Sequence, residues 1–223
     1  MSALLPIATV SERLSISGPV GLIDMLIDFP AQSPLGVALI GHSHPLLGGT
    51  AEDEVTHTIA MALRDLGFIS LRPCFRGTGG TDGVHDKGEG ETEDLLAVHH
   101  YAVRHFRDLP ILLAGFSFGA FVQSKVAQRL ADVGSPAIRL ILVSTALGNV
   151  RNVRFYAPED VPPNSLLIHG TLDNRVPLKN VMHWAEGLGL SVVAVPGADH
   201  FFNGKLDVLR SAIQASPHGQ VGR

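Results

Sequence analysis

The stretch Leu113–Ala120, Leu-Ala-Gly-Phe-Ser-Phe-Gly-Ala, is an apolar run that ends abruptly at a serine between two glycines. The run begins at Ile111 and is typical of a strand buried on both faces of a parallel sheet. After Gly119, apolar residues recur at helical spacing, and Gly134 follows as a C-terminal cap. The stretch therefore predicts a strand, a tight turn at Ser117 and a helix.

The serine at the centre of this turn suits nucleophilic chemistry. Such a turn projects the Ser117 hydroxyl above the sheet edge, and Gly115 and Gly119 must be small because neighbouring backbone passes close by. The start of the following helix directs backbone N–H groups towards a developing negative charge beside the serine oxygen. Gly-x-Ser-x-Gly is also a common short pattern, and an ordinary glycine-flanked loop is the alternative that the rest of the chain must exclude.

The rest of the chain predicts an α/β fold. Apolar runs alternate with helical periodicity, and a pair of segments with alternating polarity precedes them at residues 12–17 and 20–29. The apolar runs occupy residues 36–41, 68–71, 138–144, 165–168 and 191–195. This order predicts a mostly parallel, doubly wound sheet of about seven or eight strands, with helices on both faces and an antiparallel hairpin at one side. We expect one domain over residues 1–215 and a flexible tail over 216–223.

Composition limits the compartment and the partners. The 223 residues are 45% hydrophobic and 17% charged, with a formal net charge of −4 and no Lys/Arg cluster, so neither nucleic acid nor an anionic membrane is an expected partner. The single cysteine, Cys74, excludes an internal disulfide and is expected at a buried strand end. With no signal-like or membrane-spanning run, we expect a cytoplasmic monomer or homodimer.

A serine nucleophile needs a base, and the base needs a carboxylate. Asp173 lies just after the predicted strand 165–168, and His200 lies just after the predicted strand 191–195. Because parallel strands bring their carboxyl ends to one edge of the sheet, we expect both side chains near Ser117.

Other carboxylates are weaker candidates for the acid. Asp199 is adjacent to His200, and a neighbouring residue seldom reaches the ring nitrogen of the next. Glu159 and Asp160 precede a predicted strand, so they lie nearer the opposite edge of the sheet. We therefore assign the acid to Asp173.

With the nucleophile, acid and histidine in this order, the sequence resembles the α/β-hydrolase family. The resemblance covers nearly the whole chain and rests on four matched pieces. These are Gly115–Gly119, His169-Gly170 with Asp173 and Val176-Pro177, Gly197 with Asp199-His200, and Phe75-Arg76-Gly77 with Gly79. It implies the α/β-hydrolase fold and a catalytic triad of Ser117, Asp173 and His200.

The loop after the predicted strand 36–41 is the second informative stretch. His42–Gly49, His-Ser-His-Pro-Leu-Leu-Gly-Gly, is similar to a His-x-His-Pro-Leu-x-Gly-Gly segment of a bacterial subgroup of small serine hydrolases without a lid. In family members, this loop and the residue after the nucleophile supply the two oxyanion donors. The resemblance implies the backbone N–H groups of His44 and Phe118. At His44 the loop departs from the His-Gly-Gly-Gly pattern of the family, and the Pro45 that follows has no N–H to donate.

Metal binding is the alternative for His42 and His44, because His-x-His is a ligand spacing. Zinc would need one or two further ligands, and no acidic or histidine residues follow in a metallo-hydrolase pattern. We therefore expect neither a metal nor a cofactor.

These features predict a serine hydrolase that cleaves an ester or thioester of a small soluble acyl substrate. Residues 145–164, between two predicted strands, are too few for a large helical cap, so we expect an open site with Phe116, Phe118 and Leu46 as pocket walls. A peptidase or amidase would use the same triad. A ligand-binding protein on a hydrolase fold is the alternative outside enzymes, although it would not need all three triad residues.

Overall fold

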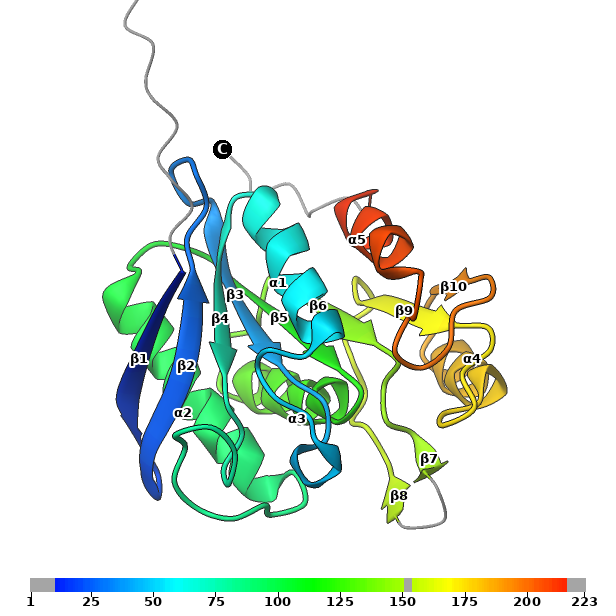
Figure 1. Cartoon of the computed structure of the whole chain (residues 1–223), viewed down its shortest axis with the longest axis horizontal. Coiled ribbons are helices and arrows are strands. Elements are labelled where there is room, and N and C mark those ends of the chain that lie inside the picture. Colours follow the sequence, from blue (N-terminus) through cyan, green and yellow to red (C-terminus); the bar gives the residue numbers. More distant parts are fainter. Residues whose placement is uncertain (1–10, 151–153, 216–223) are drawn as a thin grey trace, which may run out of the picture.

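Eight strands form the central sheet of the structure, a computed structural model that describes residues 11–150 and 154–215. The strands are β1 (Ser11–Gly18), β2 (Gly21–Asp28), β3 (Gly36–Gly41), β4 (Phe68–Pro73), β5 (Ile111–Phe116), β6 (Arg139–Val143), β9 (Leu166–Gly170) and β10 (Val192–Val195). Their order in the sheet is β1-β2-β4-β3-β5-β6-β9-β10 (Figure 1). The predicted tail at 216–223 lies outside the described residues.

The sheet is mostly parallel, as predicted. β1 and β2 form an antiparallel hairpin, and β2 is also antiparallel to β4. From β4 to β10 every neighbouring pair is parallel, so the loops that follow these strands meet at one edge. The prediction of a doubly wound sheet with a hairpin at one side is confirmed.

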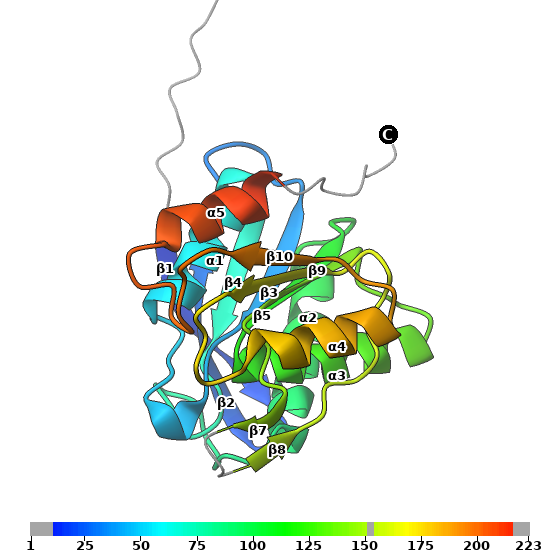
Figure 2. The same cartoon turned by 90° about the vertical axis from the view of Figure 1, so that its right-hand side faces the viewer.

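Within the described residues, five α-helices cover the two faces of the sheet: α1 (Glu54–Asp65), α2 (Glu89–His105), α3 (Phe118–Asp132), α4 (Leu178–Gly187) and α5 (Leu206–Ala215). α1 and α5 lie together on one face, and α2, α3 and α4 lie on the other (Figure 2). None of the described helices is both long and apolar enough to cross a membrane.

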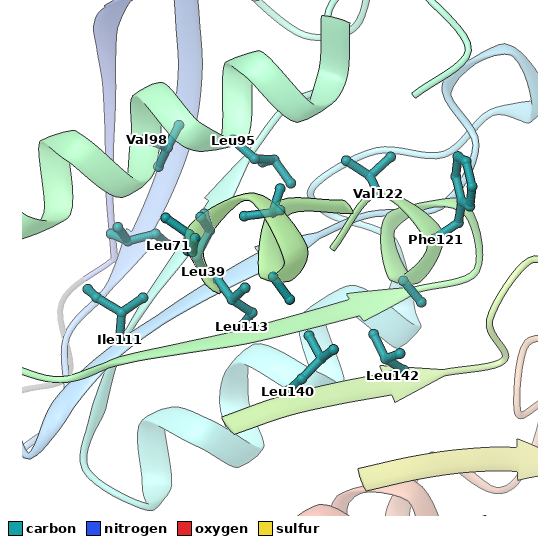
Figure 3. Packing of buried hydrophobic residues seen from close by; sticks show 14 of the residues in the cluster. Leu39, Leu71, Leu95, Val98, Ile111, Leu113, Phe121, Val122, Leu140 and Leu142 are labelled. Carbon is teal, nitrogen blue, oxygen red and sulfur yellow. The ribbon is translucent and has the colours of Figure 1, made fainter. Parts of the chain in front are cut away.

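Alternate residues of each central strand enter opposite layers of the core. Leu39 and Leu113 pack beneath α2 and α3, where Leu95 and Val98 meet them (Figure 3). The next residues of the same strands belong to the cluster under α1 and α5. This burial on both faces explains why the central strands are continuously apolar. Cys74, directly after β4, is buried as expected.

The segment between β6 and β9 has structure that its sequence did not predict. It forms a two-stranded antiparallel sheet of β7 (Gly148–Val150) and β8 (Arg154–Tyr156). This hairpin lies at the same end of the molecule as the loops after β3 and β4 (Figure 1). No large cap domain covers that end in the described part of the chain, in agreement with the prediction.

Candidate active site

Ser117 occupies a sharp turn between β5 and α3. Its backbone has φ 55° and ψ −113°, a region that a non-glycine residue adopts only when its surroundings hold it there. The Ser117 N–H donates to the Val143 carbonyl (2.9 Å), and its own carbonyl accepts from Ala146 N–H (3.1 Å) and Phe121 N–H (3.1 Å). The end of β6 and the first turn of α3 therefore fix the position of the hydroxyl.

The glycines on either side of Ser117 are required by close backbone contacts. A Cβ at Gly115 would lie 2.5 Å from the carbonyl carbon of Gly119. A Cβ at Gly119 would lie 2.2 Å from the carbonyl oxygen of Gly41, at the end of β3. The prediction that neighbouring backbone passes close to both positions is confirmed.

A continuous chain of hydrogen bonds joins the three predicted triad residues. His200 Nε2 lies 2.9 Å from Ser117 Oγ, and His200 Nδ1 lies 2.7 Å from Asp173 Oδ2. All three side chains are buried. With Asp173 ionised, Nδ1 carries the ring proton, so the Nε2 lone pair faces the serine hydroxyl and can accept its proton.

Asp173 is held as a carboxylate by the turn that follows β9. Its Oδ1 accepts from the N–H groups of Arg175 and Val176, both at 2.9 Å. Burial alone would raise the pKa of Asp173, but the hydrogen bond and charge of His200, with the Val176 N–H, outweigh burial and lower the pKa. Asp173 is therefore ready to stabilise a protonated His200.

Hydrogen bonds between the loops after β9 and β10 bring Asp173 and His200 together. Leu172 N–H donates to the Ala198 carbonyl (2.9 Å), and Gly197 N–H donates to Thr171 Oγ1 (2.9 Å). Asp199, the alternative acid, faces its own turn. Its carboxylate accepts from Phe201 N–H, Asn203 N–H and Asn203 Nδ2.

The two predicted oxyanion donors, His44 and Phe118, line the same cavity as Ser117. Phe118 is the first residue of α3, where a backbone N–H has no partner within the helix. His44 precedes the short 3-10 helix Pro45–Leu47, and its Nδ1 accepts from Leu46 N–H (3.2 Å). The rings of His44 and Phe118 pack with centroids 4.9 Å apart. In the part of the chain that the structure describes, neither backbone N–H donates to a protein acceptor.

His42 has a structural role. Its Nε2 accepts from Phe75 N–H (2.9 Å), and its Nδ1 lies 2.7 Å from the Ser43 carbonyl. Burial lowers its pKa to about 4, so the ring is neutral and both nitrogens are used within the fold. Through these bonds His42 ties the loop after β3 to the loop after β4.

A cavity of about 460 Å³ opens at Ser117 and His200. Of the three residues predicted as pocket walls, Leu46 and Phe118 line this cavity and Phe116 does not. Phe116 is fully buried in the core under α1 and α5, and its ring lies 5.3 Å from that of His200. Because side chains alternate along β5, the side chain before the serine points into this core layer, where its ring packs against that of His200.

Several residues that line this cavity were not found from the sequence, among them His85, Lys87, Arg154 and Tyr156. The first two lie in the loop between β4 and α2, and the others on β8. Arg154 Nη2 donates to the Lys87 carbonyl (2.7 Å) across 67 residues of sequence. A contact between residues so far apart in the sequence produces no local sequence pattern. The presence of the basic residues is the one feature of the sequence that could have pointed to it.

The chain is similar to two solved structures along nearly its whole length. An α/β serine hydrolase homologue from Coxiella burnetii is 35% identical with a TM-score of 0.82, covering 92% of this chain and 97% of that one. XC6422 from Xanthomonas campestris, an α/β serine hydrolase without a lid, is 32% identical with a TM-score of 0.81, covering 96% of each chain. The uncharacterised protein RP471 of Rickettsia prowazekii is 26% identical over 209 residues, 90% of this chain and 86% of that protein. No family model matches the sequence.

Proposed function

Because this chain belongs to the α/β serine hydrolases without a lid and is therefore a hydrolase, we propose that it cleaves an ester or thioester of a small acyl substrate through Ser117, His200 and Asp173. The observation that carries the proposal is the chain of hydrogen bonds from Ser117 Oγ through His200 to Asp173, with distances of 2.9 and 2.7 Å. The cavity at the serine gives a substrate access to it.

In this mechanism Ser117 Oγ attacks the acyl carbonyl carbon while His200 Nε2 takes the hydroxyl proton. Collapse of the tetrahedral intermediate breaks the bond to the leaving group, which receives that proton from His200, and leaves an acyl group on Ser117. Water then attacks the acyl carbon, His200 accepts a proton from this water, and Ser117 leaves with the proton returned to it. Asp173 stabilises the charged ring in both halves.

The N–H groups of Phe118 and His44 would bind the negative oxygen that develops in each half. Removing one such donor typically raises the barrier by ~3 kcal/mol, so the pair would supply a large share of catalysis. The Phe118 donor is favoured by its place at the N-terminus of α3, where the helix dipole adds to the hydrogen bond.

Labelling with a fluorophosphonate tests the proposal, because this reagent reacts with a serine that its base has activated. We expect the native protein and the exposed control Ser15→Ala to be labelled and to cleave 4-nitrophenyl acetate. Ser117→Ala should fold normally and do neither. Labelling that persists in Ser117→Ala, or a folded native protein that is never labelled, would contradict the proposal.

A peptidase or amidase on the same triad differs from an esterase in how the leaving group is expelled. We therefore expect kcat/KM for 4-nitrophenyl acetate to exceed that for 4-nitroacetanilide, which carries the same acyl group. A higher value for the anilide would favour the amidase.

A further inference from the structure

The cavity at Ser117 carries an unusual number of positive side chains for an acidic protein. Lys87, Arg154 and Arg175 line it, while Asp53 is the acidic residue among its described lining. The whole chain has a formal net charge of −4, so this grouping runs against the overall balance. A concave site with one sign of charge concentrates ligands of the opposite sign.

Asp53 does not neutralise Lys87 or Arg154, because its carboxylate accepts hydrogen bonds within the fold. Asp53 Oδ1 accepts from Thr56 N–H (2.7 Å) and caps α1. Its Oδ2 accepts from Ser43 Oγ (3.0 Å), next to the proposed oxyanion donor His44. Both oxygens of the Asp53 carboxylate are thus used in hydrogen bonds, one to the start of α1 and one to the loop after β3.

The half-buried Arg154 and the exposed Lys87 differ from two buried cations of the protein. Arg72 and Arg76 each contact a buried carboxylate at 2.8 Å, from Asp28 and Asp94 respectively. Within residues 11–150 and 154–215, no carboxylate lies within ion-pair distance of Arg154 or Lys87. Their charges are therefore left for a ligand in the cavity.

The loop that carries Lys87 is held in place before any ligand binds. The buried Glu91 carboxylate accepts from Asp86 N–H (2.9 Å) and Gly88 N–H (2.8 Å), and it lies 2.7 Å from His85 Nδ1. Lys87 itself has φ 59°, in the left-handed region. This conformation is strained for a non-glycine residue, and the hydrogen bonds of Glu91 to the residues on either side hold the loop in it beside the cavity.

Arg154 is positioned from two sides. Its Nη2 donates to the Lys87 carbonyl (2.7 Å), and its guanidinium carbon lies 5.3 Å from the centre of the Tyr156 ring. Its charge reaches the proposed oxyanion loop: burial, His85 and Arg154 together lower the pKa of His44 to about 4. Burial is the largest of these causes, and the buried Glu91 acts in the opposite direction by raising the pKa of His44.

Resting on the proposed role of Ser117, we infer that the acyl substrate carries an anionic group, a carboxylate or a phosphate, that Arg154 and Lys87 bind while its apolar part contacts the other walls. Leu46, Leu47, Val150 and Phe201 form these apolar walls. Charge-assisted hydrogen bonds from a guanidinium and an ammonium suit either anion.

The test compares three 4-nitrophenyl esters of equal chain length that end in a carboxylate, a phosphonate or a primary amide. We expect kcat/KM for at least one anionic ester to exceed that of the amide by about tenfold at low salt, since a hydrogen bond to a charged group is strong. Added salt should reduce this ratio. The better of the two anions identifies the class.

Variants connect the preference to the two cations. Arg154→Gln and Lys87→Met should each lower the ratio about tenfold, whereas Arg154→Lys should retain part of it. The exposed control Arg104→Gln should keep the native ratio. Fluorophosphonate labelling and thermal unfolding of every variant show that the triad and the fold are intact.

The outcomes separate this inference from the function on which it rests. A native protein that is labelled at Ser117 but cleaves the amide ester as fast as both anionic esters would overturn the inference and leave the hydrolase proposal standing. An anion preference unchanged in both cation variants would also overturn it. Absence of both labelling and turnover would instead overturn the proposed function.

Discussion

His200 has two carboxylates near it in sequence or space, and only one is turned towards its ring. Asp173 Oδ2 lies 2.7 Å from His200 Nδ1, while the Asp199 carboxylate binds three N–H groups of its own turn. The hydrogen bond to His200 fixes which nitrogen carries the proton. Asp173 rather than Asp199 is therefore placed to act as the acid, because its carboxylate points towards the His200 ring.

Asp173→Asn tests this choice. The amide can still accept from the Val176 N–H, but its NH₂ group would face His200 Nδ1 and favour the tautomer in which Nε2 carries the proton. We expect kcat to fall by ~10³–10⁴-fold with little loss of stability. Asp199→Asn is the matched control and should retain native turnover. Equal losses in both variants would argue against Asp173 as the acid.

For single residues, the sequence predicted which ones follow the ends of strands, but it did not predict the direction of every side chain. Ser117, Asp173 and His200 could be placed at one sheet edge because each follows an apolar run. Phe116 was wrongly expected in the pocket, because the pattern Gly-x-Ser-x-Gly does not tell which face of β5 its second residue enters. Arg154 was missed because its contact with Lys87 depends on the whole fold.

β3, β5 and α3 meet so closely at the serine turn that their backbones touch. This contact explains why the strand, turn and helix could be predicted from a short stretch, since only glycine allows it at positions 115 and 119. The β7–β8 hairpin could not be predicted, because strands of three residues are too short to show a period of two.

Gly119→Ala tests how tightly these elements are packed. The new methyl group would lie 2.2 Å from the Gly41 carbonyl oxygen, so β3 or the turn must move. We expect the free energy of unfolding in urea to fall by ~1–3 kcal/mol and turnover to fall with it. Gly187→Ala, near the end of α4 with nothing within 4 Å, should be neutral or stabilising. No difference between the two variants would contradict this packing.

Across the whole molecule, burial sets how stability depends on pH. Five histidines of the described chain have a lowered pKa, with burial as the largest cause in each. They are His42, His44, His57, His99 and His169. Between their folded pKa and the ordinary value of 6.5, the unfolded chain binds more protons than the folded one. The contribution of these histidines to stability is therefore complete above pH 6.5 and is lost as the pH falls from 6.5 towards their folded pKa values.

His42 is the sharpest case, because its pKa falls from 6.5 to about 4 and its ring is fully buried. Because the folded state keeps this ring neutral, His42 alone should lower the free energy of unfolding by roughly 3 kcal/mol as the pH falls from 6.5 to 4. Urea unfolding at several pH values measures this slope. His42→Gln lowers stability at neutral pH by disturbing the bonds to Phe75 and Ser43, but it cannot take up a proton, so its slope in this range should be shallower. The exposed control His100→Gln should keep the native slope, and a native slope in His42→Gln would show that His42 does not supply the acid sensitivity.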